Sequence, residues 1–422
     1  MMSLFPRSSS ESHCPSETGE SLSEAFLNSS SRTRDSLPEQ YQSIFDELRN
    51  GILAFCQEFE IPNEALKDLK AFEFQLTSKK IPAERMAEAV LLFQQLEHLV
   101  THGEPLKETL PEHFQETERL YHLTEQYTAQ FNLLKEAGIL NERNAIVGID
   151  GKEYPVPTLE QIAKRLYERE KELSIKRDQG FIKLLLVPFG MSLDALRETL
   201  KQFLLAYKQT HEDFDLDIND PLWTWEEGYK GADIGNPPKM FYYPKFFDDN
   251  HQGQTKTQIL EAQKINEASF PGWTVHLFQP SDTRDLDQSS PRGIVPISQE
   301  GEGRSYREEH DRPDVETNKT PIQYLAILEE AQDDPTSPYH YESGLTPEDW
   351  IFAFMTHLEE TGKPLDDYIQ SIAFLTEAFF PSVKSPVVPI AYWDRTDKLV
   401  RLGRNEPHIK DGIAGLRTSV IV

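Results

Sequence analysis

The spacing of apolar residues predicts helices in the first third of the chain. Six apolar residues recur at alternating steps of four and three: Tyr41, Phe45, Leu48, Ile52, Phe55 and Phe59. This spacing is typical of one apolar helix face and is close to a coiled-coil seam. Shorter stripes predict three further helices, the last of which ends at Gly138. Because short connections join antiparallel helices, we expect residues 37–140 to form an all-α helical bundle.

The apolar period changes after residue 140. Asp150-Gly151 lies between two short extended runs and is typical of a type I′ hairpin turn. Thr158 is placed to cap a helix that reaches about residue 177. The apolar run 181–187 is short enough for a buried strand, and Ser192 is placed to cap the helix that follows. Residues 141–212 are therefore predicted to be a hairpin-helix-strand-helix segment leading into the C-terminal domain.

From residue 213 onward, helices become sparse, and Gly, Pro, Trp and Tyr become frequent. Thr320 and Thr346, each followed by proline, are predicted to open two helices. The strand candidates are residues 240–243, 273–278, 293–297, 387–393, 398–402 and 416–422. The fold class is therefore predicted to be α+β, with a loop-rich α+β domain over residues 213–422 after the helical bundle.

Composition and charge add an expected tail and exclude some partners. Residues 1–36 are Ser-rich, carry few apolar residues and are predicted to be a disordered tail. The formal net charge of −28 disfavours nucleic acid and anionic membranes as partners. No apolar stretch is long enough to span a bilayer, no secretory signal is recognisable, and the two cysteines, Cys14 and Cys56, suit a reducing compartment. We expect a cytoplasmic protein.

Candidate chemistry is weak along the whole chain. Asp213, Asp215 and Asp217 alternate as calcium ligands can, but Ile218 and Thr224 occupy positions where an EF-hand loop needs Gly and Glu. His310 has acidic neighbours and is the best acid–base candidate, although such charge runs are usually solvated loops. No nucleophile motif or phosphate-binding loop is present, so no catalytic residue, metal or cofactor is predicted.

Two aromatic clusters allow two interpretations. Residues 223–225 and 241–243 are rich in Trp, Tyr and Phe. They could form a ligand platform, but a core at the junction of irregular segments would use the same residues. The core interpretation is favoured.

Several short motifs resemble known proteins. Residues 223–225 and 231–233, the run 342–350 and Ala391-Tyr392-Trp393 are similar to an uncharacterised family of candidate-phyla bacteria. The closing run 415–420 resembles the last strand of C-type-lectin-like domains of the formylglycine-generating-enzyme type, which also serve as targets of diversity-generating retroelements. Leu416 stands where that strand usually has Phe, and both cysteines lie far upstream of this region, which argues against oxidase activity.

The resemblance implies a contact surface just before the closing strand, over residues 392–411. Variable ligand-contacting residues lie there in the retroelement targets. The corresponding residues in this chain are Tyr392, Trp393, Arg395, Asp397, Arg401, Arg404, Asn405 and His408. Aromatic and Arg side chains are common at binding surfaces.

Three hypotheses follow from the sequence. The first is a binding protein without catalysis, in which the C-terminal surface takes an unknown protein or small-molecule ligand. Its N-terminal helices would supply a scaffold or a homo-oligomer seam. The second is a metal-dependent hydrolase that uses the acidic loop at 213–220 and His310. The third is a helical adaptor in which residues 37–140 are the functional part.

Overall fold

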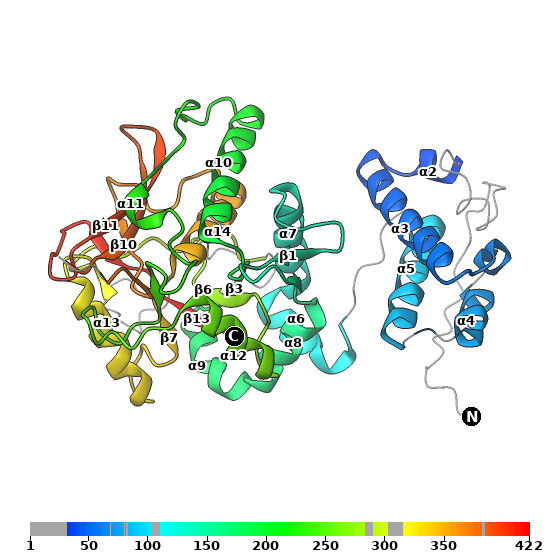
Figure 1. Cartoon of the computed structure of the whole chain (residues 1–422), viewed down its shortest axis with the longest axis horizontal. Helices are drawn as coiled ribbons and strands as arrows, with labels where there is room; N and C mark the ends of the chain where they lie inside the picture. Colours follow the sequence, from blue (N-terminus) through cyan, green and yellow to red (C-terminus); the bar gives the residue numbers. More distant parts are fainter. Residues whose placement is uncertain are drawn as a thin grey trace. The chain divides into compact units, whose positions relative to one another are not determined.

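The chain divides into two compact units, residues 1–109 and residues 110–422. The computed structural model describes residues 32–67, 69–79, 81, 83–102, 110–282, 290–302, 315–381 and 385–422. Helices dominate the N-terminal half, and most of the strands lie in the C-terminal half (Figure 1), so the predicted α+β class is confirmed. In the described residues, no helix is long and apolar enough to cross a membrane.

The first unit is helical. Its helices are α2 (Arg32–Ser36), α3 (Glu39–Glu58), α4 (Leu69–Ser78) and α5 (Ala83–His102), with a 3-10 turn at Asn63–Lys67. Most of the predicted tail, residues 1–31, lies outside the described residues. Its last five residues are helical rather than disordered, because Arg34 pairs with Asp46 of α3 at 2.8 Å.

The apolar stripe of α3 is buried inside this unit. Phe45 and Ile52 are fully buried and share a core with α4 and α5, where Phe72 and Phe93 stack with their ring centroids 5.0 Å apart. Cys56 lies in the same core, and burial raises the pKa of its thiol to about 11. The seam that could have joined two chains is therefore occupied by helices of the same unit.

The helix predicted as the last of the bundle belongs to the second unit. It is divided into α6 (Gln115–Tyr121) and α7 (Leu123–Glu136) at His122, whose φ of +49° breaks the helix. Tyr121, Leu123 and Leu134 lie in the core of residues 110–422. The expected bundle of residues 37–140 is therefore corrected at its C-terminal end.

One antiparallel sheet forms the centre of the second unit. Its strand order is β3 (Lys183–Val187), β6 (Thr274–Phe278), β13 (Ser419–Ile421) and β7 (Glu342–Ser343). The closing strand β13 thus lies between two neighbours, with Val420 opposite Leu277 of β6. All residues of β3 and β6 are buried, which agrees with the continuous apolar run that predicted β3.

Helix α7 protects the free edge of β3 with two glutamine side chains. Gln126 accepts a hydrogen bond from Leu184 N–H at 2.9 Å and donates to the Ile182 carbonyl. Gln130 accepts from Leu186 N–H at 2.7 Å and donates to the Leu184 carbonyl. Four helical residues rise about 6 Å and two strand residues about 6.6 Å, so the glutamines match the ladder spacing. They satisfy an edge that would otherwise be open to pairing.

A five-stranded sheet carries the predicted contact segment. Its order is β12 (Ala414–Leu416), β8 (Ile372–Phe374), β10 (Val388–Asp394), β11 (Leu399–Asn405) and β4 (Leu222–Thr224). The β10–β11 hairpin is antiparallel, with Tyr392 opposite Arg401, and β4 runs parallel to β11. The predicted strand 416–422 is divided between the two sheets, because the buried Arg417 lies between β12 and β13.

The remaining strands form two small two-stranded sheets. They pair β1 (Ala145–Val147) with β2 (Glu153–Pro155) and β5 (Phe241–Tyr242) with β9 (Ala378–Phe379). The first is the predicted hairpin, with Gly151 at φ +73°. The predicted strand 293–297 is absent: this segment bonds to Gln279 only through Val295 and forms no ladder.

The remaining helices surround the sheets. They are α8 (Leu159–Glu168), α9 (Glu170–Asp178), α10 (Leu193–Thr210), α11 (Glu226–Tyr229), α12 (Lys256–Ile265), α13 (Pro321–Asp333) and α14 (Pro347–Thr361). The predicted N-caps Thr158, Ser192, Thr320 and Thr346 each accept the expected backbone hydrogen bond, so they are confirmed. Helix α14 is buried from Pro347 to Leu358 and packs against α10 and β3 (Figure 1).

Candidate functional site

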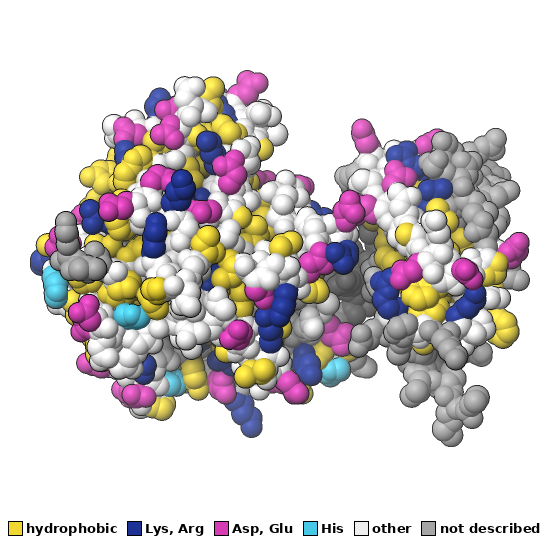
Figure 2. All heavy atoms as spheres, viewed as in Figure 1, with side chains coloured by type: hydrophobic (Ala, Val, Ile, Leu, Met, Phe, Trp, Pro, Cys, Tyr) yellow, Lys and Arg dark blue, Asp and Glu magenta, His cyan; other side chains and the backbone are white. Residues whose placement is uncertain are grey.

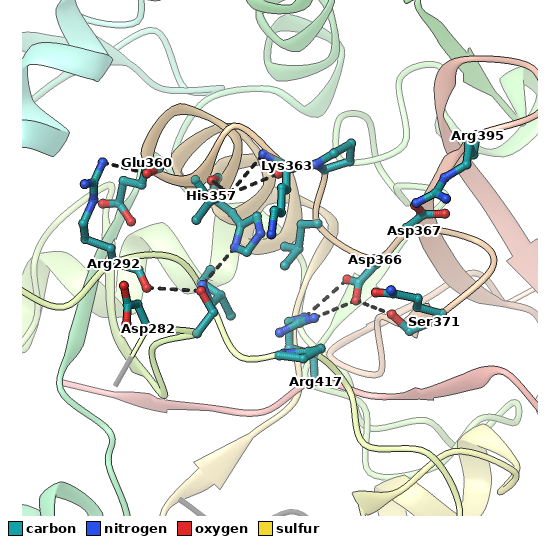
Figure 3. A pocket seen from close by; sticks show the side chains of 17 residues that line it. Asp282, Arg292, His357, Glu360, Lys363, Asp366, Asp367, Ser371, Arg395 and Arg417 are labelled. Carbon is teal, nitrogen blue, oxygen red and sulfur yellow. Dashed lines mark hydrogen bonds and ion pairs between the residues drawn. The ribbon is translucent and has the colours of Figure 1, made fainter. Parts of the chain in front are cut away.

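A charged cavity of about 910 Å³ lies at the C-terminal end of α14. Five parts of the chain line it: the end of α14, the loop 363–371 that follows, the segment 281–282, the segment 292–296, and Arg417 at the crossing between the sheets (Figure 3). Arg395, from the turn of the β10–β11 hairpin, completes the lining. The cavity therefore gathers residues that are far apart in the sequence.

Three carboxylates of the cavity lining have described protein partners: Asp366, Asp367 and Glu360. Asp366 accepts hydrogen bonds from Trp350 Nε1 at 2.8 Å, from Ser371 Oγ and from the Arg417 guanidinium. Asp367 pairs with Arg395. Figure 3 shows these two pairs side by side along one wall.

The third paired carboxylate, Glu360, lies on the opposite wall. It accepts a hydrogen bond from Gly293 N–H at 2.7 Å and pairs with the buried Lys183 of β3. The negative charge of these three carboxylates is thus largely balanced within the protein.

His357 is an almost buried histidine that faces this cavity. Its Nδ1 accepts a hydrogen bond from Ile294 N–H at 2.9 Å, so the neutral ring carries its proton on Nε2. Burial, with a smaller contribution from Arg417, lowers the pKa of His357 to about 4. At neutral pH the ring is therefore uncharged and has one N–H to donate.

Two cations in the cavity lining have no carboxylate partner among the described residues. Arg292 donates from Nη2 to the Glu360 carbonyl at 2.7 Å, which satisfies the end of α14. The Lys363 ammonium has no hydrogen-bond or ion-pair partner in the described part of the chain. In Figure 3 its side chain runs beside the His357 ring, and its charge contributes to the lowered pKa of that histidine.

A second cavity of about 480 Å³ adjoins the first and is more aromatic. Tyr207 stacks on His211 with ring centroids 3.9 Å apart, and Phe214 lies 5.2 Å from both Tyr207 and Trp393. Pro364, Asp367 and Arg395 line both cavities. The Arg395–Asp367 ion pair therefore marks the boundary between the charged compartment and one lined mainly by aromatic rings, together with Asp213 and Asp215.

The eight predicted contact residues do not form one surface. Trp393 is buried and lines the aromatic cavity, while Arg395 lines both cavities. Tyr392 and Arg401 share the outer face of the five-stranded sheet, where Arg401 pairs with Asp397.

Two aromatic residues from elsewhere in the chain extend this outer face. Tyr368 packs on Tyr392 at 5.3 Å, and the Arg401 guanidinium lies 5.2 Å from the Trp223 ring. Trp223 is 41% exposed, whereas Tyr242 of the second aromatic cluster is fully buried. The core interpretation thus holds for Tyr242 but not for Trp223.

The last three predicted residues lie toward the far end of the hairpin. Arg404 is exposed and lies 4.5 Å above the Trp225 ring, on the opposite face from Arg401. Asn405 ends β11, and His408 is exposed beyond it. None of the three lines either cavity.

The acidic loop at 213–220 does not gather metal ligands in the part of the chain that is described. No three His, Cys, Asp or Glu side chains converge there or elsewhere among those residues. Asp215 pairs with Lys398 at 2.9 Å, and Asp217 accepts a hydrogen bond from Asn219 N–H. The other proposed group, His310, lies outside the described residues. Nothing in the described geometry favours the hydrolase hypothesis.

A serine and a histidine of the central sheet also meet a carboxylate of helix α14. His276 Nδ1 lies 2.9 Å from Ser419 Oγ, and its Nε2 lies 3.1 Å from Asp349 Oδ1. These are the residue types of a nucleophilic triad. However, His276 and Ser419 are 0% exposed and Asp349 is 1% exposed, so a substrate cannot reach the hydroxyl. We interpret the group as a polar element of the core.

Charge on the surface is mixed rather than segregated. Figure 2 shows acidic and basic side chains interspersed over the visible face, although acidic residues exceed basic ones by 28 in the chain. The unpaired cations of the charged cavity therefore contrast with the overall charge.

No protein-family model, curated protein or solved structure matches the chain.

Proposed function

We propose that this chain is a cytoplasmic binding protein whose ligand occupies the two adjoining cavities of residues 110–422. The observation that carries the proposal is the position of Arg395: it belongs to the contact segment expected from the sequence and forms part of both cavity walls. Concave sites that combine an aromatic part with a few convergent polar groups are typical of small-molecule binding.

The proposal includes a C-type-lectin-like arrangement of the C-terminal lobe. Its support is the central place of the closing strand β13 and the β10–β11 hairpin that precedes it in the sequence. In this proposal the hairpin is the variable element, and the ligand is bound without catalysis. Substitutions among close relatives should then concentrate in residues 392–411. Substitutions spread evenly over the C-terminal lobe would contradict this part.

The binding site can be tested by filling the charged cavity. Gln370 is exposed, lines this cavity, and its side chain has no partner in the described residues. Gln370→Trp should therefore block the cavity without disturbing the core. Ile369→Trp is the matched control, because Ile369 is 64% exposed on the same loop and lines neither cavity.

A small-molecule fragment library is screened against the full chain and both variants by ligand-observed NMR. We expect fragments that bind the wild type and Ile369→Trp but lose binding to Gln370→Trp. The proposal is overturned if no fragment binds. It is also overturned if every fragment that binds the wild type binds Gln370→Trp equally well, because the ligand site is then not in these cavities.

A further inference from the structure

We propose that the charged cavity recognises a carboxylate group on a small organic anion with an apolar ring, with Lys363 and the Nε2–H of His357 as its donors. This inference rests on the proposed function and names the class of ligand.

The carboxylates of the cavity argue against a cationic ligand. Asp366, Asp367 and Glu360 already have charged partners, and each also accepts a further N–H or O–H hydrogen bond. The fourth carboxylate of the lining, Asp282, is not free either. A cation would have to displace Arg395, Arg417 or Lys183 from these pairs. An anion meets no such competition, because Lys363 and Arg292 have no carboxylate partner among the described residues.

The end of helix α14 does not repel an anion strongly, because its last carbonyls are occupied. Glu360 O accepts from Arg292, His357 O accepts from Thr361 Oγ1 at 2.7 Å, and Leu358 O accepts from Gly362 N–H at 2.8 Å. These donors offset the partial negative charge that a helix C-terminus carries.

His357 supplies a fixed, uncharged donor beside Lys363. The Ile294 N–H holds Nδ1, so only Nε2–H is available to a ligand, and in the described part of the chain the hydrogen bond from Ile294 is the one found at this ring. His357 is 8% exposed and lines the cavity, which places this polar group at its wall. A neutral N–H next to an ammonium is a suitable pair for the two oxygens of a carboxylate.

The aromatic cavity explains why the anion should carry an apolar ring. Tyr207, Phe214 and Trp393 line this compartment, and Arg395 joins it to the charged one. Asp213 and Asp215 also line it, so the ring is expected to lie here and the carboxylate beside Lys363. The volumes of both cavities are in the range of small-molecule sites. A ring could pack among the aromatic side chains, where such pairs are favourable, while its carboxylate reaches Lys363.

The matched probes are benzoate and benzamide, which have nearly the same shape but differ in charge. Binding to the full chain is measured by calorimetry for the wild type and for two variants. Lys363→Gln removes the proposed cation, and Lys410→Gln removes an exposed lysine that lines neither cavity. We expect benzoate to bind more tightly than benzamide, and Lys363→Gln to weaken benzoate about tenfold. Lys410→Gln should leave the affinity for benzoate unchanged.

Several outcomes overturn the inference. They are equal affinity for the amide and the acid, equal effects of the two lysine variants, or no benzoate binding. If in any of these cases other fragments still lose binding to Gln370→Trp, the proposed function stands and only the ligand class is wrong. If Gln370→Trp does not weaken the binding of any fragment, both the proposed function and the ligand class are wrong.

Discussion

The neutral state of His357 should make the stability of residues 110–422 depend on pH. Burial and the nearby Arg417 lower its pKa from an ordinary 6.5 to about 4. Lys183 and Lys363 act in the same direction, and Asp366 opposes them. The unfolded chain therefore binds a proton at this residue between about pH 6.5 and 4, while the folded chain does not. Stability from this residue is fully present above pH 6.5 and is lost as the pH falls.

The size of the loss follows from the two pKa values. A shift from 6.5 to about 4 changes the free energy of unfolding by about 2 kcal/mol between pH 7 and pH 5. Other groups also titrate in this interval, so the wild type alone does not isolate His357. The variant His357→Gln provides the reference, because its amide oxygen can accept the Ile294 N–H but cannot be protonated. The difference between the two proteins should fall by about 2 kcal/mol from pH 7 to pH 5.

Urea unfolding followed by tryptophan fluorescence is the appropriate assay. All five tryptophans lie between residues 223 and 393, so the signal reports on the second unit alone. Unfolding curves at a series of pH values give the free energy for each protein. A stability difference that stays constant with pH would refute the reasoning, and so would a His357 pKa near 6.5 measured by NMR in the folded protein.

Three further predictions follow from the fold. A fragment of residues 110–422 should fold, whereas a fragment of 141–422 should aggregate because it exposes the edge of β3; equal solubility and equal melting temperatures would contradict this. Lys256→Met should lower the free energy of unfolding by about 3–5 kcal/mol in chemical denaturation, since two buried carboxylates pair with Lys256, while Lys230→Met at an exposed site should change it by less than about 0.5 kcal/mol. With the other cysteine replaced by serine, Cys56 should react with a thiol reagent far more slowly in the native protein than in urea; equal rates would show that it is not buried.

Features with local causes could be predicted from the sequence. The N-caps at Thr158 and Thr346 depend on residues three positions apart, and both form as expected. The hairpin at Asp150-Gly151 and the buried strand β3 also follow from neighbouring residues. In these cases the physical cause lies within one or two turns of chain.

Features that depend on distant contacts could not be predicted in this way. The apolar stripe of α7 predicted a helix, but it did not show that this helix packs in the core of residues 110–422. The four-residue spacing of Gln126 and Gln130 was the available signal, because two amides on a buried helix face need partners. The cavity was hidden for the same reason: His357 meets Ile294 across 63 positions, and Asp366 meets Arg417 across 51.

The ion pairs of the second unit explain why the charged cavity should be preformed. Arg417 lies between β12 and β13 and holds Asp366 of the loop after α14, so one buried pair ties the two sheets to the cavity wall. Lys183 of β3 holds Glu360 at the end of α14 on the other side. Buried pairs add little net stability, but breaking one leaves an uncompensated charge, so each strongly disfavours other arrangements of its segments. The cavity walls are therefore fixed before a ligand binds, so binding loses little conformational entropy from ordering them.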